Sequence, residues 1–368
     1  MRRPLLLPVV LLAATALALP AYAASAPRAH PGVTVHGADR VVDRTADRGV
    51  ARGVKHVPVP KAARAVDTSH PDRVIGNGTP ASCTSKKVVR AVAKGGVITF
   101  ACGPDPVVIT MRRTAKVVNT SRRVVIDGGG LVTLSGGGKR RILYQNTCDQ
   151  GQIWTTDHCD DQARPKLVVQ HVTFAHGNST GNHVEGGGGG AIFVRGGQLK
   201  IVDARFLDNR CDRSGPDLGG AAVRDLSHSH LAPAYVVGST FRGGRCSNGS
   251  GLSSIGVSWT VLNSVFRHNR AIGHGANPTR PGTKGGGSGG AIYTDGNRYS
   301  LLVAGTLMRH NHANEGGGAI FYVSNDRSGR LHIHWSTLKN NVSERFETRP
   351  GIFYLGRGPI ETRHSIIR

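Results

Sequence analysis

The chain has 368 residues, of which 38% are hydrophobic but only 5% aromatic, so any core is built mainly from Val, Ile, Leu and Ala. Its 51 glycines follow no strict Gly-X-Y period, which excludes collagen. The formal net charge of +24 indicates a preference for polyanions such as acidic polysaccharides, teichoic acids or nucleic acid. The alternative is that this charge serves only colloidal solubility.

Residues 1–23 have the pattern of a secretory signal peptide. Arg2 and Arg3 form a basic start, an apolar run extends from Leu5 to Leu19, and small residues follow at Ala21-Tyr-Ala23. The apolar run is too short for a membrane span, and no other segment is apolar enough to be one. We therefore expect a soluble protein that is secreted and extracellular.

Residues 24–75 predict a disordered basic linker. No aromatic residue occurs between Tyr22 and Phe100, and the acidic and basic residues of this segment are interspersed. Such a segment buries too little apolar surface to offset the entropy lost on ordering. The sequence does not decide whether the linker is a pro-peptide.

The folded domain is expected to span residues 76–368 and to begin with a short helix. The segment from Ser85 to Gly96 has an amphipathic pattern, with Ser85 as the N-cap and Gly95 as the stop, and residues 97–101 are a predicted strand. Further short β-branched runs follow between glycine-rich turns. A helix ahead of stacked strands is suited to cover the end of a solenoid.

An eight-residue block recurs from Leu167 onward, with successive ends 25 to 42 residues apart. Its first and third positions are mostly apolar, its fifth tends to be a turn former, its sixth is often Ser or Thr, and its last is large and apolar. Such variable spacing around a constant block predicts stacked coils with variable loops. The blocks are 167–174, 199–206, 234–241, 259–266, 301–308, 331–338 and 360–367.

Two further features repeat with the blocks. A glycine-rich unit, of which residues 285–296 are the longest copy, lies between them, and glycine permits positive φ and close approach of coils. An asparagine follows several blocks at one offset, and we interpret these residues as a structural ladder of stacked side chains. They are Asn209, Asn269, Asn311 and Asn341.

The six cysteines indicate an oxidising compartment, and their dispersal without a Cys-x-x-Cys pair argues against zinc. Cys211 and Cys246 each lie five residues after the end of a block, so stacking places them about 4.8 Å apart, within reach of a disulfide. Proximity in sequence favours two other pairs. The expected disulfides are Cys83–Cys102, Cys148–Cys159 and Cys211–Cys246.

With these repeats, residues 75–368 resemble a right-handed parallel β-helix of the pectin-lyase-like superfamily. The Gly-Gly-Ala-Ile units and the Phe-x-x-Asn units are also similar to repeats of polymorphic outer-membrane proteins. The resemblance implies an all-β solenoid with a capping helix, but it covers lyases, hydrolases, esterases and non-catalytic adhesins. Calcium-dependent pectate lyases need several acids on adjacent coils. The fifth block position supplies only Asp203. We therefore expect no cofactor, and calcium stays as an alternative that no cluster of acids supports.

A pair of acids offers the strongest candidate for catalysis. Asp225 and Asp295 each lie four residues after the first Ala of their glycine unit. They would lie two coils apart, with their backbones separated by about 9.6 Å. That separation is near the carboxyl spacing of an inverting glycosidase. Nearby Tyr293 would stack on sugar if its face points outward, with Arg195 and Arg224 for an acidic substrate; if the face points inward, these side chains are core.

The sequence therefore predicts a secreted β-helix protein that binds, and in one version cleaves, an acidic polysaccharide or another cell-wall polyanion. A cleaving enzyme would be a polysaccharide lyase or a glycoside hydrolase. The alternative is a non-catalytic extracellular adhesin or cell-wall-binding structural protein. We expect a monomer, and neither a membrane nor nucleic acid as its partner.

Overall fold

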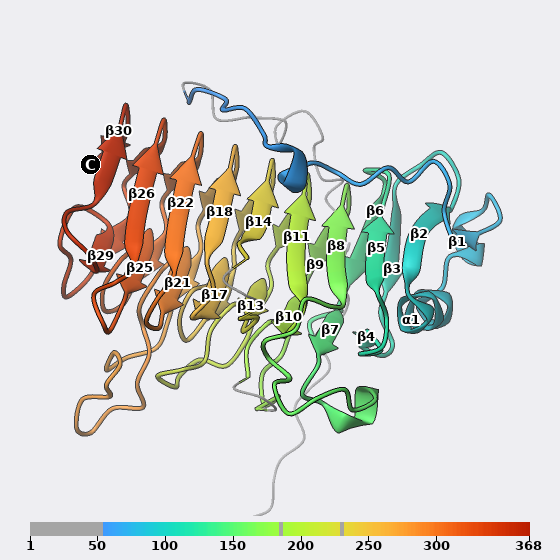
Figure 1. The fold of residues 1–368 in the computed structure, drawn as a ribbon, viewed down its shortest axis with the longest axis horizontal. Helices are drawn as coiled ribbons and strands as arrows, with labels where there is room; N and C mark the ends of the chain where they lie inside the picture. The colour runs from blue at the N-terminus through green and yellow to red at the C-terminus, as the bar shows by residue number, and fades with distance from the viewer. Residues whose placement is uncertain (1–53, 184–186, 229–231) are drawn as a thin grey trace, which may run out of the picture. The chain divides into compact units, whose positions relative to one another are not determined.

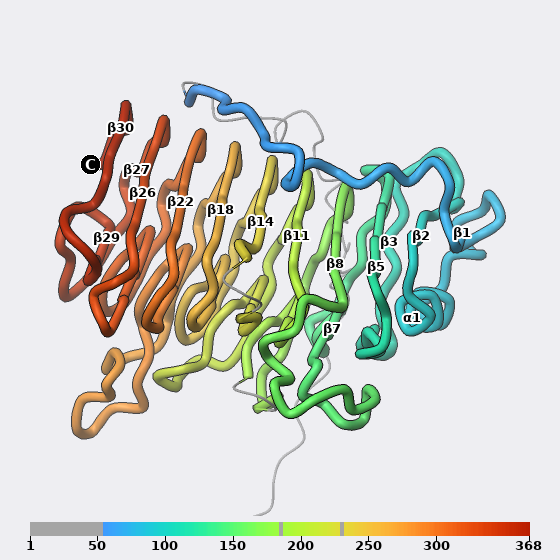
Figure 2. The backbone as a smooth tube through the Cα atoms, in the orientation of Figure 1, coloured from blue at the N-terminus to red at the C-terminus, as the bar shows by residue number. Residues whose placement is uncertain are grey.

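The computed structural model describes residues 54–183, 187–228 and 232–368, all within one unit of the chain, Thr45–Arg368. The expected signal peptide and residues 24–53 of the expected linker lie outside the described residues. The described residues form a parallel β-helix, in which the chain passes through the same sheets in coil after coil (Figure 1). Figure 2 shows the backbone winding through these coils, from the end that holds α1 to the C-terminus.

Four parallel sheets, here named A to D, make up the described part of the coil. Sheet A contains β1 (Arg73–Gly76), β2 (Gly96–Ala101), β5 (Arg123–Asp127), β8 (Lys166–Gln170), β11 (Gln198–Val202), β14 (Ala234–Val237), β18 (Trp259–Leu262), β22 (Ser300–Ala304), β26 (Arg330–His334) and β30 (Glu361–Arg363). Sheet B contains β3 (Val107–Thr110), β6 (Val132–Ser135), β9 (Thr173–Ala175), β12 (Arg205–Leu207), β15 (Thr240–Arg242), β19 (Val265–Arg267), β23 (Leu307–Arg309), β27 (Thr337–Lys339) and β31 (Ile366–Ile367).

The remaining strands complete each turn of the coil. Sheet C contains β4 (Ala115–Lys116), β7 (Leu143–Asn146), β10 (Ile192–Arg195), β13 (Val223–Asp225), β17 (Leu252–Ile255), β21 (Ile292–Asp295), β25 (Ile320–Val323) and β29 (Ile352–Leu355). Sheet D contains β16 (Arg245–Cys246), β20 (Arg270–Ala271), β24 (His312–Ala313) and β28 (Val342–Ser343). Three 3-10 turns lie outside the sheets: η1 (Lys61–Ala63), η2 (Pro80–Ser82) and η3 (Gln150–Gln152).

The capping helix is α1 (Ser85–Lys94), and it lies at the end of the coil beside β2 (Figure 1). Its apolar face buries Val88 and Val92 in the main core. The N-cap is Thr84, whose hydroxyl accepts a hydrogen bond from the Lys87 amide, so the prediction of Ser85 as N-cap is wrong by one residue. The Ser85 hydroxyl instead accepts from the Arg112 amide. The helix ends at Gly95, which has a φ of 68°.

The fifth position of each repeat block turns a corner of the coil. All seven residues there have positive φ, between 46° and 60°, which is the left-handed region that Gly, Asn and Asp adopt most readily. The preference for turn formers at this position is therefore a backbone requirement. These residues are His171, Asp203, Gly238, Asn263, Gly305, Trp335 and His364.

Inside the coil, equivalent side chains stack on one another. Four phenylalanines at the last block position form a row with ring centroids 4.6 to 5.3 Å apart. At the sixth position, each side-chain hydroxyl accepts a hydrogen bond from the backbone amide of the sixth-position residue one coil earlier. This series of bonds begins at the Ala204 amide and ends at the Ser365 hydroxyl. The predicted asparagine ladder is present for three of its four residues, because Asn269 donates to Asn311 and Asn311 donates to Asn341, each at 2.9 Å. Asn209 stands apart from it, because Gly244 holds the position between Asn209 and Asn269.

All three expected disulfides are present. The Cα–Cα separations are 5.7 Å for Cys83–Cys102, 4.9 Å for Cys148–Cys159 and 4.7 Å for Cys211–Cys246. Three disulfides fit an oxidising compartment. None of the helices within the described ranges is long and apolar enough to cross a membrane.

Residues 54–72, here called the strap, run across the outer face of sheet A before the chain enters β1 (Figure 1). The backbone of Val57 exchanges two hydrogen bonds with the Asn263 side chain, at 2.8 and 2.9 Å. Val66 does the same with Gln170, at 2.8 and 2.9 Å. Val57 and Ala63 also pack on apolar side chains of sheet A. The described part of the expected linker is thus held against the coil.

Candidate functional site

The structure does not bring Asp225 and Asp295 together. In sheet C, Asp225 pairs with Ser254, and Ser254 pairs with Thr294 rather than with Asp295. The expected alignment is therefore wrong by one residue. Because successive side chains of a strand point to opposite faces, the two carboxylates lie on opposite sides of sheet C. A pair of facing carboxylates for glycoside hydrolysis does not form there.

The two acids have different surroundings. Asp225 is fully buried on the inner face, where its Oδ1 accepts from the Ser227 amide and its Oδ2 has no hydrogen-bond partner among the residues that the structure describes. Burial raises the pKa of Asp225 to about 6. Asp295 is partly exposed, and its Oδ1 accepts hydrogen bonds from the Gly296 amide and the Asn325 side chain.

The expected substrate-binding residues also have local partners. Arg195 lies 3.9 Å from the Asp160 carboxylate. Arg224 is 1% exposed and donates to the Ser253 hydroxyl and to the Asp217 carbonyl. Tyr293 is also 1% exposed, and its hydroxyl lies 3.3 Å from Asp295 Oδ2. The structure thus places Tyr293 beside Asp295, but both Tyr293 and Arg224 are covered.

These two covered side chains belong to one row on the outer face of sheet C. The row is mostly aromatic, and loops lie over it: Arg141, for example, donates to the carbonyls of Gly188 and Gly189 while its guanidinium stands 4.8 Å from the Phe193 ring. The face points outward, but it is packed like a core. The row consists of Tyr144, Phe193, Arg224, Ser253, Tyr293, Phe321 and Phe353.

A different surface collects positive charge in register. On the outer face of sheet B, Arg242 pairs with Arg267, Arg267 with Arg309, and Arg309 with Lys339. A parallel row crosses sheet D, where Arg210 pairs with Arg245 and Arg245 with Arg270. We call the two rows together the cationic band: Arg210, Arg242, Arg245, Arg267, Arg270, Arg309 and Lys339.

Between the two rows the chain turns a second corner, at residues with positive φ such as His268 (56°) and His310 (54°). His268 and His310 stack there, with ring centroids 5.3 Å apart. Desolvation lowers the pKa of His268, and the charges of His310, Arg267 and Arg309 lower it further. Like charges at a strand spacing of about 4.8 Å repel one another, so the cationic band has an unfavourable electrostatic energy in the free coil.

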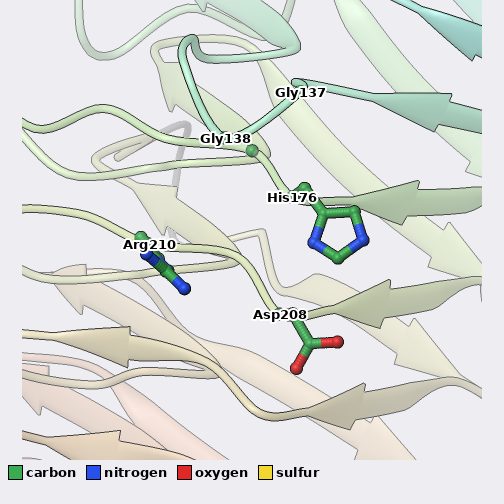
Figure 3. Close-up of a pocket in the computed structure, with 6 residues that line it drawn as sticks. Gly137, Gly138, His176, Asp208 and Arg210 are labelled. Carbon is green, nitrogen blue, oxygen red and sulfur yellow. The ribbon is translucent and has the colours of Figure 1, made fainter. Parts of the chain in front are cut away.

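A hollow of about 330 Å³ opens at the end of the cationic band. His176 and Asp208 line the hollow from equivalent corners of neighbouring coils (Figure 3). Arg210, two residues after Asp208 in the chain, also lines it. Three glycines line the rest of the hollow, so no side chain fills it there. Its volume lies at the lower end of the range for small-ligand sites. Asp208 and Arg210 give its wall one acidic and one basic side chain. The glycines are Gly137, Gly138 and Gly177.

The total charge of the chain does not reveal the cationic band, because it does not show which charges lie in register on neighbouring strands. Its sequence signal is a basic residue directly after a block or four places after it. The first position holds Arg242, Arg267, Arg309 and Lys339, and the second holds Arg210, Arg245 and Arg270.

Comparisons with protein-family models, curated proteins and solved structures found no significant match. The function has to be argued from the chain itself.

Proposed function

We propose that this is a secreted protein that binds an acidic polysaccharide, or a related cell-wall polyanion, along the cationic band. The observation that carries the proposal is the register of Arg242, Arg267, Arg309 and Lys339 on neighbouring strands. A linear polymer with an anionic group on each residue offers a series of charges to a series of cations. Bound anions also relieve the repulsion between stacked like charges.

The electrostatic field of the whole chain supports the same ligand class. Basic residues number 47 against 23 acidic ones. Within the cationic band Arg210, Arg245 and Arg270 are exposed, and the sheet B members are partly exposed. Guanidinium groups suit carboxylate and sulfate groups, because their N–H donors form paired hydrogen bonds with two acceptor oxygens. The hollow at His176 and Asp208 would take one residue of the polymer at the end of the band.

The first experiment measures binding of polygalacturonate, alginate and a glycosaminoglycan to the wild type and to a variant with four band arginines neutralised. We expect the variant to bind at least about tenfold more weakly, equivalent to about 1.4 kcal/mol, and with less dependence on salt. The control removes the same charge from exposed positions on α1 and near the end of β21. The substitutions are Arg242→Gln, Arg245→Gln, Arg270→Gln and Arg309→Gln against Lys86→Gln, Lys87→Gln, Arg90→Gln and Arg298→Gln. Equal losses in the two variants would contradict a defined site.

Cleavage is a separate question, which the same ligands address. The bound polymers are incubated with and without calcium, and reducing ends and unsaturated products are followed. Products that disappear in a His176→Gln, Asp208→Asn variant would place a lyase or hydrolase activity at the hollow. Binding without products favours the non-catalytic alternative, an adhesin or cell-wall-binding protein.

A further inference from the structure

Two histidines and a glutamate meet at the C-terminal end of sheet A. His332 and His334 are alternate residues of β26, so their side chains leave the same face of the strand. Glu361 on β30 pairs directly with His332. Its Oε2 lies 2.9 Å from His332 Nδ1, and its Oε1 lies 3.4 Å from His334 Nε2.

His334 departs from the pattern of the coils before it, where its position is held by Val202, Val237, Leu262 and Ala304. The positions paired with His332 and His334 one coil earlier are Leu302 and Ala304, and the strap packs against that part of the face. Apolar residues there are explained by burial, whereas adjacent imidazoles and a carboxylate are not. His334 Nε2 is buried and has no hydrogen-bond partner of good geometry among the described residues. Its nearest acceptor is Glu361 Oε1 at 3.4 Å, which is long for a hydrogen bond but is a separation that a bridging metal ion can span.

We propose that His332, His334 and Glu361 bind a divalent first-row transition-metal ion, with Zn²⁺ as the best match. One ligand atom from each residue lies within 4.8 Å of the other two. An ion about 2.0–2.2 Å from each ligand brings ligand atoms to roughly 3–3.5 Å from one another, so the three ligand atoms need only a small inward movement to bind it. Two imidazoles and one carboxylate form a ligand set suited to zinc, and they leave a fourth coordination position open.

Neighbouring residues support the three ligands. Arg363 donates to Glu361 Oε1 at 2.7 Å, which fixes the direction of the carboxylate. The rings of His332 and His334 stand nearly perpendicular, at 76° with centroids 5.9 Å apart, so they approach a common point from different directions. Both strands belong to the regular sheet, which holds the ligands more rigidly than a loop would.

The open coordination position has room beside it. A hollow of about 290 Å³ lies between the strap and sheet A, and His334 forms part of its wall. The rest of the wall is mostly apolar, from Val57, Leu302, Ala304 and Trp335 among others. A small molecule that coordinates the metal through a polar group can place an apolar body in this hollow. The metal site is on sheet A and is independent of the cationic band on sheets B and D.

The test is titration of the untagged full-length protein, first stripped with chelator, with Zn²⁺ by calorimetry and with Co²⁺ by visible absorption. We expect one tight site per chain and an intense Co²⁺ spectrum of four-coordinate type. The His332→Ala, His334→Ala variant should lose at least about a hundredfold in affinity, and Glu361→Gln about tenfold or more. Unfolding midpoints in chelator establish that both variants remain folded.

The matched control is His268→Ala, His310→Ala, which removes a different pair of stacked histidines on the surface. This variant should keep the tight site and the Co²⁺ spectrum. The proposal is overturned if the wild type shows no tight binding, or if the control loses as much affinity as the His332, His334 variant. Either result would make the cluster a structural ion-pair network.

Discussion

The outer face of sheet C and the cationic band are both rows of like residues repeated in register, but they have opposite energetic consequences. On sheet C, Tyr293, Phe321 and Phe353 stack at 4.9 to 5.0 Å; the first two are buried and Phe353 is partly buried. In the cationic band, arginines take the same in-register positions and face solvent. Stacked rings attract one another, and stacked cations repel. The aromatic row therefore stabilises the fold, while the cationic band is suited to a ligand.

The largest expected effect comes from breaking the aromatic row. Phe321 is 4% exposed and contacts three other rings. Phe321→Ala should lower the free energy of unfolding by about 3–4 kcal/mol, because it leaves a cavity between stacked rings. Chemical unfolding measures the change. Polyanion affinity of the folded variant should equal that of the wild type, and a tenfold loss of affinity would mean that the two faces are not separate.

The second prediction contrasts a charge inside the coil with the charges outside it. The folded pKa of Asp225 is raised from 3.8 to about 6, so the native state loses stability as the pH rises through this window and the buried carboxyl ionises. Asp225→Asn should remove that loss and raise the free energy of unfolding at pH 7 by about 1–3 kcal/mol. Unfolding curves from pH 4 to pH 7 check it. Asp295→Asn, at a partly exposed acid, is the control and should show no such gain.

The third prediction tests the repulsion within the cationic band. Arg309→Gln should leave the stability of the free protein unchanged or raise it by about 0.5 kcal/mol, because it removes the positive charge that lies between Arg267 and Lys339. The same substitution should weaken polyanion binding several-fold. Thermal unfolding and a binding titration measure the two effects on one sample. A clear loss of stability would show that Arg309 supports the fold as the aromatic residues do.

The smallest expected effect concerns His268. Its pKa is lowered by desolvation and by neighbouring positive charge, so it is mainly neutral at pH 7. A bound polyanion supplies negative charge that raises this pKa, and binding should therefore strengthen as the pH falls below 6.5. Affinity measured from pH 5 to pH 8 tests this. His268→Gln should reduce the pH dependence, whereas His364→Gln, on another corner of the coil, should retain it.

Much of the fold was predictable because parallel stacking repeats one set of constraints. The positive φ at the fifth block position, the hydroxyl row at the sixth and the ladder from Asn269 to Asn341 are each visible as sequence columns. The Cys211–Cys246 disulfide follows from the same alignment. Register within the glycine units was harder. Either Ala221 or Ala222 can be aligned with Ala291 in the sequence. In the structure Ala222 is the equivalent residue, because Val223 and Ile292 both pair with Leu252.

The candidate sites were less visible because they depend on what covers each face. Sequence alone does not tell that loops bury Arg224 and Tyr293 while Arg245 and Arg270 stay exposed. The meeting of His332 and Glu361 was in contrast visible, because both hold the second position of consecutive blocks, 331–338 and 360–367. The alternation His-x-His was a usable signal, since it places both rings on one face of a strand.

The strap has a consequence for the order in which the chain folds. Neighbouring coils contact one another across one repeat, and such local contacts form quickly. The bonds of Val57 to Asn263 span 206 residues, and those of Val66 to Gln170 span 104. Gln170 and Asn263 are in place only after their coils have formed, so we expect the strap to dock first at Val66 and then at Val57. A protease that cuts between residues 54 and 72 would then distinguish chains that have completed their coils from chains that have not.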